Sequence, residues 1–282
     1  MAVKAPFNYI GNKYRIIELI QEYFPKNIDT FVDIFCGGCD VTVNTIANKV
    51  YANDINYHVI GILQEFQNND VDFILEHIDT TIEKWKLSKT NESGYKAFRN
   101  HYNQTKNPLD LYVLMCYSFN YQFRFNSNHD YNNPFGRNRS SFNEVMRNNL
   151  ILFKKQIDDI HFSADDFCDF NYDVLKSGDF IYADPPYLLT CGSYNDGKRG
   201  FRGWTENDDC ELLKKLDMLS DRGVYFALSN VLEHKGSINN LLIDWASEND
   251  YVIHDINFNY NNCNYHTNNR NNTTKEVLIT NY

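Results

Sequence analysis

Two consecutive prolines in the second half of the chain define where one strand must end. The apolar run Phe180-Ile181-Tyr182-Ala183 is short and is typical of a buried strand. It leads into Asp184-Pro185-Pro186-Tyr187, and two prolines in a row cannot continue a sheet ladder. Asp-Pro-Pro is also an ordinary turn. In an α/β sheet, however, this pattern places a carboxylate and an aromatic ring at the carboxyl end of a strand, which is where ligands bind.

The rest of the chain alternates strand and helix patterns at both ends, which predicts an α/β fold. Predicted strands cover Thr30–Phe35, Val50–Asn53, Ile160–Phe162, Phe180–Ala183, Val224–Leu228, Tyr251–Ile256 and Glu276–Thr280. Predicted helices cover Asn12–Phe24, Val41–Asn48, Glu206–Leu219 and Ser237–Glu248, with further helical patterns over Tyr57–Lys86 and Pro108–Tyr117. The middle of the chain therefore reads as a mostly helical insertion.

Composition limits the class of protein. With 43% hydrophobic and 23% charged residues, the 282-residue chain is typical of soluble globular proteins. It has no apolar run of membrane-spanning length and no signal-peptide pattern. Seven cysteines at irregular spacing favour a reducing compartment over a disulfide framework. We therefore expect a cytoplasmic protein that does not contact a membrane.

Charge is distributed unevenly. The net charge of −10 disfavours non-specific nucleic-acid binding by the whole surface. Between residues 121 and 155, however, basic residues outnumber acidic ones; the basic residues are Arg124, Arg137, Arg139, Arg147, Lys154 and Lys155. The segment Phe119–Ser141 is aromatic and rich in asparagine, with Gly and Pro, which predicts a hairpin or loop. A second asparagine-rich stretch, 257–274, predicts a solvated loop.

A nucleotide-type loop follows the first predicted strand. Phe35-Cys36-Gly37-Gly38 provides glycines for a tight turn and close backbone approach, and Asp54 ends the next strand, where a carboxylate can hold ribose hydroxyls. Cys36 and Cys39 could instead form a redox pair or half of a zinc site. No second cysteine pair follows at zinc spacing, so we predict no metal.

These pieces together resemble the Dam-type (D12 class, group alpha) family of DNA adenine-N6 methyltransferases. The matching segments follow the family's order: Pro6-Phe7-Asn8-Tyr9-Ile10-Gly11-Asn12-Lys13-Tyr14, Asp33-Ile34-Phe35-Cys36-Gly37-Gly38, Asn53-Asp54, Ser163-Ala164-Asp165-Asp166-Phe167, Asp184-Pro185-Pro186-Tyr187 and Lys275-Glu276-Val277-Leu278-Ile279-Thr280-Asn281-Tyr282. Arg124-Phe125-Asn126 and Asn133-Pro134-Phe135-Gly136-Arg137 look like the family's DNA-reading hairpin. One departure is Cys39, where the family commonly has glycine or another small residue.

The resemblance implies a Rossmann-like fold that binds S-adenosyl-L-methionine (AdoMet), with a catalytic domain from residues 1–58 and 151–282. Residues 59–150 would form a mostly helical target-recognition domain containing a hairpin. The implied cofactor-binding residues are Tyr9, Lys13, Phe35, Gly37, Gly38, Asp54, Asp165, Phe167 and Asp184, with Asp166 as an equal alternative to Asp165. The implied catalytic residues are Asp184, Pro185, Pro186 and Tyr187. The implied DNA-binding residues are Asn120, Arg124, Asn126, Pro134, Arg137 and Arg139.

In the implied reaction, Asp184 and the Pro185 carbonyl accept the two amine protons of a flipped adenine, and Tyr187 stacks on the base. Arg124 suits a guanine edge, Asn126 or Asn120 an adenine edge, and the other arginines phosphates. The expected partner is double-stranded DNA, with GATC as the implied site. A cognate restriction endonuclease remains open as a partner, and no obligate protein partner is predicted.

Three alternatives are compatible with parts of this pattern. The same constellation could methylate an adenine in RNA, which a parallel transfer assay on both nucleic acids would distinguish. Cytosine-N4 methylation usually goes with serine at the position of Asp184. A non-catalytic DNA-binding module would fail to bind AdoMet.

Overall fold

The fold is built on one mixed sheet with the strand order β3-β2-β1-β4-β5-β8-β7. The computed structural model describes residues 2–190, 201, 203–256 and 274–282, so most of the predicted asparagine-rich loop lies outside the described residues. The strands are β1 (Thr30–Asp33), β2 (Lys49–Asn53), β3 (Ile160–Ser163), β4 (Phe180–Ala183), β5 (Tyr225–His234), β7 (Val252–Asp255) and β8 (Thr274–Thr280). The first five are parallel, whereas β8 runs antiparallel to both β5 and β7. A short strand, β6 (Ser237–Ile238), pairs with β5.

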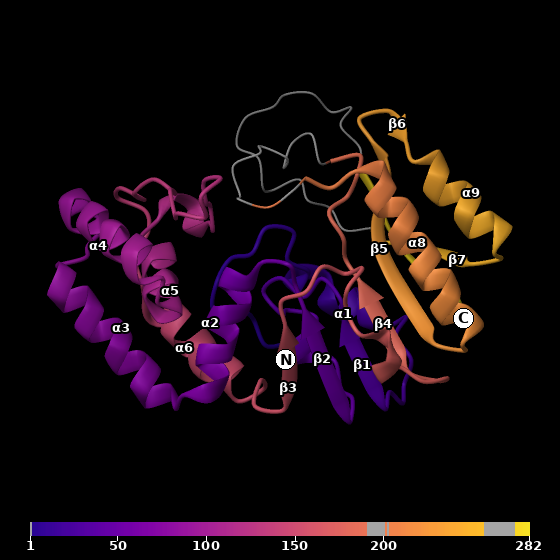
Figure 1. Ribbon diagram of the computed structural model, residues 1–282, viewed down its shortest axis with the longest axis horizontal. Helices are drawn as coiled ribbons and strands as arrows, with labels where there is room; N and C mark the ends of the chain where they lie inside the picture. Colours follow the sequence, from indigo (N-terminus) through magenta and orange to yellow (C-terminus); the bar gives the residue numbers. More distant parts are fainter. Residues whose placement is uncertain (1, 191–200, 202, 257–273) are drawn as a thin grey trace.

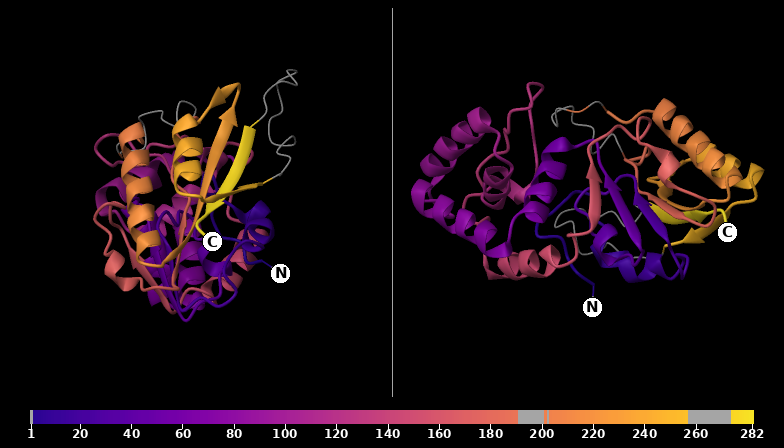
Figure 2. Two further views of the ribbon diagram at one scale, coloured as in Figure 1. Left: turned by 90° about the vertical axis from the view of Figure 1, so that its right-hand side faces the viewer. Right: turned by 60° about the horizontal axis from the view of Figure 1, so that its bottom comes forward.

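Alternating residues of the central strands pack against helices on opposite faces of the sheet. Val32 and Ile181 share a core with α8 (Glu206–Asp221) and α9 (Asn240–Glu248). Phe31 and Phe180 face the short α1 (Ile17–Gln21) and the 3-10 turn η1 (Tyr14–Ile16) that precedes it. Figure 2 shows α8 and α9 side by side. The result is a three-layer α/β arrangement, as the sequence predicts.

A group of helices lies beyond the β3 edge of the sheet (Figure 1). The group consists of α2 (Tyr57–Asn68), α3 (Val71–Trp85), α4 (Glu92–Thr105), α5 (Pro108–Cys116) and α6 (Glu144–Lys154). Every residue of α5 except Pro108 is buried, and the helix begins with Asn107 as its N-cap and proline in the first turn. The Tyr112 hydroxyl donates to the carbonyl of Pro6 at 3.2 Å, which ties α5 to the N-terminal segment. Among the described residues, no helix is both long and apolar enough to cross a membrane.

Three predicted helices need correction. The predicted helix over Val41–Asn48 is only a 3-10 turn, η2 (Thr42–Asn44), because this segment is β-branched and the Thr45 hydroxyl bonds back to the carbonyl of Val41 at 2.9 Å. The predicted helix over Asn12–Phe24 is confined to η1 and α1. The helix predicted from Ser237 begins at Asn240, after β6, and Asn239 caps it. The sequence pattern also missed α4 and α6.

The segment 118–141 forms a hairpin-like excursion without regular strands. Its two sides are joined by isolated antiparallel bridges between Ser118 and Phe135 and between Phe125 and Tyr131. Gly136 is required here by close packing, since a Cβ atom would lie 2.6 Å from the carbonyl oxygen of Ser118. The prediction of a hairpin or loop is thus confirmed.

Candidate active site

The strand order reverses between β1 and β4, and the predicted site residues gather at that point. The chain passes from β1 to β2 and β3 on one side, and resumes with β4 and β5 on the other. The glycine loop follows β1, Asp54 follows β2, Asp165 follows β3 and Asp184 follows β4. Since the four strands are parallel, these residues share one edge of the sheet, at a topological switch point.

Asp184 is held from two sides. Its Oδ2 forms an ion pair with Lys13 Nζ at 2.8 Å, and its Oδ1 accepts a hydrogen bond from the Tyr187 hydroxyl at 2.8 Å. Lys13 Nζ also donates to the Gly11 carbonyl at 3.0 Å and lies 5.1 Å from the centre of the Tyr187 ring. The Lys13 side chain is 5% exposed and that of Asp184 17% exposed. Elements far apart in the sequence therefore form one nearly buried cluster.

A fourth member of the cluster, Glu276, was missed as a site residue from the sequence. Its Oε1 lies 3.6 Å from Lys13 Nζ and accepts from the Tyr187 hydroxyl at 3.1 Å. Glu276 is near the amino end of β8, and an antiparallel strand brings that end to the same edge as the carboxyl ends of its parallel neighbours. The sequence signal was an acidic residue directly before the apolar run Val277-Leu278-Ile279 of the closing strand.

Burial and opposite charge act against each other in this cluster. Burial alone would lower the pKa of Lys13, but the carboxylates of Asp184 and Glu276 outweigh it, and the pKa of Lys13 lies above its ordinary value. Burial raises the pKa of the Asp184 carboxyl, while Lys13 limits the rise. Burial also raises the pKa of Tyr187 well above its usual range. At neutral pH, Lys13 is therefore charged and Tyr187 keeps its proton.

The glycine loop lies against the N-terminal segment. Gly37 has φ +48°, and a Cβ atom there would lie 2.7 Å from the ring of Tyr9, so only glycine fits. Gly38 is also close, since a Cβ atom at that position would lie 3.2 Å from the Cβ atom of Tyr9. Cys39 is buried and has φ +65°, a conformation that favours glycine. A residue other than glycine at position 39 therefore has a local cost in backbone conformation.

Asp54 closes the loop. Its Oδ2 accepts from the backbone N–H of Gly37 at 3.0 Å, and its Oδ1 accepts from that of Asn56 at 2.8 Å. Burial raises the pKa of Asp54, and these two N–H groups act in the opposite direction. Nearby Asp33, at the end of β1, accepts from the Thr42 hydroxyl at 2.6 Å through Oδ2, whereas its buried Oδ1 has no hydrogen-bond partner among the described residues. Burial raises the pKa of Asp33 to about 7.

The acidic segment after β3 distinguishes its two aspartates. The side-chain oxygen of Asn53 accepts from the backbone N–H of Asp165 at 2.9 Å, and its amide donates to the Asp165 carbonyl at 3.0 Å. The Asp165 side chain is exposed, whereas Asp166 Oδ1 accepts from the N–H of Cys168 at 3.0 Å and shapes the turn. Neither residue caps a helix.

Three aromatic rings line the same end of the sheet. The Phe35 ring lies 5.6 Å from that of Phe167 and 5.6 Å from that of Trp204, and the latter two are 5.4 Å apart. The Trp204 indole donates to Asp209 Oδ1 at 2.7 Å, which fixes its plane. Trp204 was not predicted from the sequence, since it precedes α8, far along the chain from Phe35.

The prolines that follow Asp184 differ in exposure: Pro185 is buried and Pro186 is exposed. The described residues contain no group of three or more His, Cys, Asp or Glu arranged to hold a metal ion, and Cys36 and Cys39 are free buried thiols.

Within the hairpin-like segment, the predicted DNA-binding residues have different local roles. Asn120 is exposed, with φ +55°. Asn126 Oδ1 accepts from the N–H groups of Asn128 and Asp130, both at 2.9 Å, so that oxygen is used within the turn. The carbonyl of Pro134 accepts from Phe119 at 2.7 Å. Arg124 is half-buried.

The basic residues of this region are partly neutralised. Arg137 forms an ion pair with Glu92, Arg147 with Asp79 at 2.5 Å, and Lys154 with Asp158. Arg139 is exposed, and its guanidinium has no ion-pair partner in the described part of the chain. A count of basic residues therefore overstates the positive charge available to a nucleic acid.

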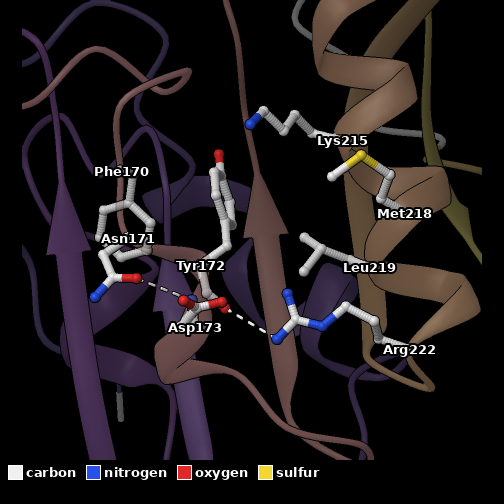
Figure 3. Close-up of a pocket in the computed structure, with 8 residues that line it drawn as sticks. All are labelled: Phe170, Asn171, Tyr172, Asp173, Lys215, Met218, Leu219 and Arg222. Atoms are coloured by element: carbon white, nitrogen blue, oxygen red, sulfur yellow. Dashed lines mark hydrogen bonds between the residues drawn. The ribbon is translucent and has the colours of Figure 1, made fainter.

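A pocket of about 270 Å³ lies elsewhere, between the 3-10 turn η4 (Tyr172–Val174) and α8 (Figure 3). Arg222 donates from Nη2 to the carbonyls of Tyr172 at 3.3 Å and Leu175 at 2.7 Å, and Lys215 lies 5.4 Å from the centre of the Tyr172 ring. These groups join η4 to α8. None of the pocket's lining residues belongs to the switch-point cluster, which consists of Lys13, Asp184, Tyr187 and Glu276.

Comparison with known proteins agrees with this geometry. A family model described as D12 class N6 adenine-specific DNA methyltransferase matches residues 9–262. The chain is 49% identical to the type II methyltransferase M.FokI of Planomicrobium okeanokoites and 50% identical to the modification methylase StsI of Streptococcus sanguinis. In both cases the match covers 99% of this chain and 43% of the relative, so the chain spans less than half of their length. It is 22% identical to the DNA adenine methylase of Escherichia coli K12, over 80% of each chain.

Proposed function

The chain belongs to the D12 class of N6 adenine-specific DNA methyltransferases, and from that premise we propose that it transfers a methyl group from AdoMet to N6 of adenine in duplex DNA. The observation that carries the proposal is the Asp184 carboxylate, held by Lys13 and Tyr187 at the switch point of the sheet. A carboxylate fixed there is a ready acceptor for an amine proton, and the half-buried tyrosine ring beside it can support a flat base.

The residues around the glycine loop fit AdoMet, which when bound supplies an electrophilic methyl group on its sulfonium. Asp54, already fixed by two backbone N–H groups, would hold the ribose hydroxyls. The unpartnered buried Oδ1 of Asp33 would accept from the ammonium group. We assign the adenine contact to Asp165 because Asp166 is used by its turn, and Phe35 and Phe167 would flank the ring. Tyr9, Gly37 and Gly38 would form the wall beside the methionine moiety.

The adenine amine is a weak nucleophile because its lone pair is delocalised into the ring. Asp184 would accept one of its protons and the Pro185 carbonyl the other, which localises the lone pair toward the methyl group. Positioning and electrostatics then provide most of the acceleration. Tyr187 would stack on the base through the face opposite Lys13. A base inside a duplex cannot reach this cluster, so the target must flip out, at a cost of a few kcal/mol.

We propose that residues 59–150 recognise the DNA, with residues 1–58 and 151–282 forming the catalytic domain. Arg124 would read a guanine edge, and the exposed Asn120 would read adenine. Asn126 would act as a turn residue, since its amide oxygen already accepts two hydrogen bonds. Arg139 suits a phosphate better than Arg137, which is paired with Glu92.

The names of the relatives at about half identity, a type II methyltransferase and a modification methylase, support a role in restriction and modification. We propose a cognate restriction endonuclease acting on the same DNA as the biological partner, and the cytoplasm as the place of action. The implied GATC site rests on the Dam-type resemblance, and identity to the Escherichia coli DNA adenine methylase is only 22%. The recognition sequence must therefore be sought among all adenine contexts.

Two experiments test the proposal. Transfer of labelled methyl groups from AdoMet should occur on duplex DNA and not on RNA of the same sequence, and hydrolysed product should contain N6-methyladenine. Modification-sensitive sequencing of DNA from cells that express the chain should show one methylated sequence context, absent from cells that express Asp184→Ala. Label transferred only to RNA, or N4-methylcytosine as the product, would refute the proposal.

A further inference from the structure

The Tyr187 hydroxyl lies between two carboxylates but has only one proton to donate. Its oxygen is 2.8 Å from Asp184 Oδ1 and 3.1 Å from Glu276 Oε1. Because a phenol donates a single hydrogen bond, only one carboxylate can receive it at a time. The ring itself stays in place in either case, since both acceptors lie within hydrogen-bond distance.

Asp184 has both oxygens engaged when Tyr187 donates to it. Lys13 Nζ forms an ion pair with Oδ2 at 2.8 Å, and the Tyr187 hydroxyl donates a hydrogen bond to Oδ1. A target amine approaching Asp184 must then compete with one of these donors. If the tyrosine proton turns to Glu276, Oδ1 becomes available without loss of a buried hydrogen bond.

From this geometry we propose that Glu276 is a positioning residue for methyl transfer: it takes over the Tyr187 hydroxyl and shares the charge of Lys13, so that Asp184 can accept the target amine. The inference rests on the proposed function, since the amine is the substrate of that reaction. Glu276 does not contact the amine in this scheme and acts through Tyr187 and Lys13.

The electrostatic surroundings support this role. Lys13 is the basic group that forms an ion pair with Asp184, and it faces two carboxylates. The other titratable groups that face the cluster are Asp33 from β1 and Tyr182 from β4. The negative charge of Glu276 raises the pKa of both Lys13 and Asp184. Removing it should lower both values.

The test compares Glu276→Gln, which keeps an acceptor oxygen for Tyr187 but removes the charge, with Glu276→Ala, which removes both. The matched control is Glu233→Gln, the same substitution on the neighbouring strand β5, outside the cluster. For each protein, kcat and KM for labelled methyl transfer to duplex DNA are measured across pH. The pKa of Lys13 is followed by NMR in lysine-labelled protein, with Lys13→Arg for assignment, and thermal unfolding checks the fold.

We expect Glu276→Ala to lower kcat at least roughly tenfold, with KM changed less than about twofold, and Glu276→Gln to recover part of the loss. In both variants the acid limb of kcat should move to lower pH, since Asp184 stays ionised to lower pH, and the pKa of Lys13 should fall. Glu233→Gln should match the wild type in all respects. A kcat for Glu276→Ala within about twofold of wild type, or a loss of kcat with an unchanged pH profile and Lys13 pKa, would overturn the role of Glu276. An inactive wild-type protein would instead overturn the proposed function, and this inference with it.

Discussion

The switch-point cluster and the hairpin-like segment are both expected to meet DNA, but the fold holds them differently. Asp184 lies at the end of a buried strand and is fixed by an ion pair to the buried Lys13 and a hydrogen bond from the half-buried Tyr187. The segment 118–141 has only two isolated bridges, and its backbone is held by buried polar side chains such as Asn133, whose amide donates to the carbonyls of Phe119 and Gln122. A sheet edge determines atomic positions closely, whereas a segment without regular strands leaves its exposed side chains free to change. That division suits a constant reaction with a variable recognition sequence.

The largest expected effect is at Asp184. Asp184→Ala should lower methyl transfer by roughly a thousandfold or more, because it removes the acceptor that orients the amine. Single-turnover transfer to duplex DNA measures the loss, and circular dichroism with thermal unfolding checks that the variant is folded. Substantial turnover in a folded variant would show that another group accepts the amine proton. The contrast between a closely held catalytic cluster and a variable hairpin-like segment would then fail.

The pH dependence of stability tests how strongly burial at the sheet edge disfavours the charged form of Asp33. A folded-state pKa of about 7 lies above the unfolded value, so the protonated form is favoured by folding, and stability is lost as pH rises from about 4 to about 7. In the absence of AdoMet, Asp33→Asn should therefore gain stability over wild type across this window, by at most roughly 4 kcal/mol. Urea unfolding at several pH values measures the difference. A stability difference independent of pH would show that Asp33 is ionised in the folded protein without penalty.

Asp54→Ala should weaken AdoMet binding by roughly 1–3 kcal/mol, because a charged acceptor for the ribose is lost and the N–H of Gly37 loses its partner. Binding to DNA should be unchanged, since the hairpin-like segment is untouched. Calorimetry with AdoMet and fluorescence anisotropy with a DNA duplex separate the two affinities. If DNA binding weakens equally, the two regions are coupled more tightly than their contacts suggest.

Arg124→Ala should cost roughly 1–3 kcal/mol of discrimination at one guanine, as expected for a bidentate contact to a base edge. Competition between the cognate duplex and single-base variants measures it. Equal weakening on all duplexes would indicate that Arg124 holds DNA without reading it, and the next residues to test would be Lys4 and those after Asn257.

The smallest effect is expected at Arg139. Arg139→Ala should weaken binding to all sequences and lower the slope of affinity against salt by about one unit, as for one phosphate contact. Arg137→Ala is the matched control, because its exposed guanidinium is already paired with Glu92 and should change the slope less. If Arg137→Ala lowers the salt slope more than Arg139→Ala does, DNA binding must break the ion pair between Arg137 and Glu92.

Much of the catalytic side could be predicted because its signals are local. The prolines after Asp184 end β4 where expected, and Gly37 lies in the predicted tight turn after β1, with a positive φ. The helix predicted over Val41–Asn48 failed because a β-branched segment with a side-chain to backbone hydrogen bond does not sustain an α-helix in this loop. The basic residues between 121 and 155 predicted more positive charge than the structure offers, because a sequence shows charged residues but not the ion pairs that neutralise them.

By itself the sequence determined the α/β class, the strand ends that carry Asp54 and Asp184, and the family, because each depends on short-range patterns that any fold of this chain must respect. Only the tertiary structure decided that Glu276 joins Lys13 and Asp184, and that Trp204 joins Phe35 and Phe167. These partners lie on elements far apart in the chain. Their meeting depends on the direction of β8 and on the placement of α8 against the sheet, and both follow from how apolar faces pack together rather than from any local sequence signal.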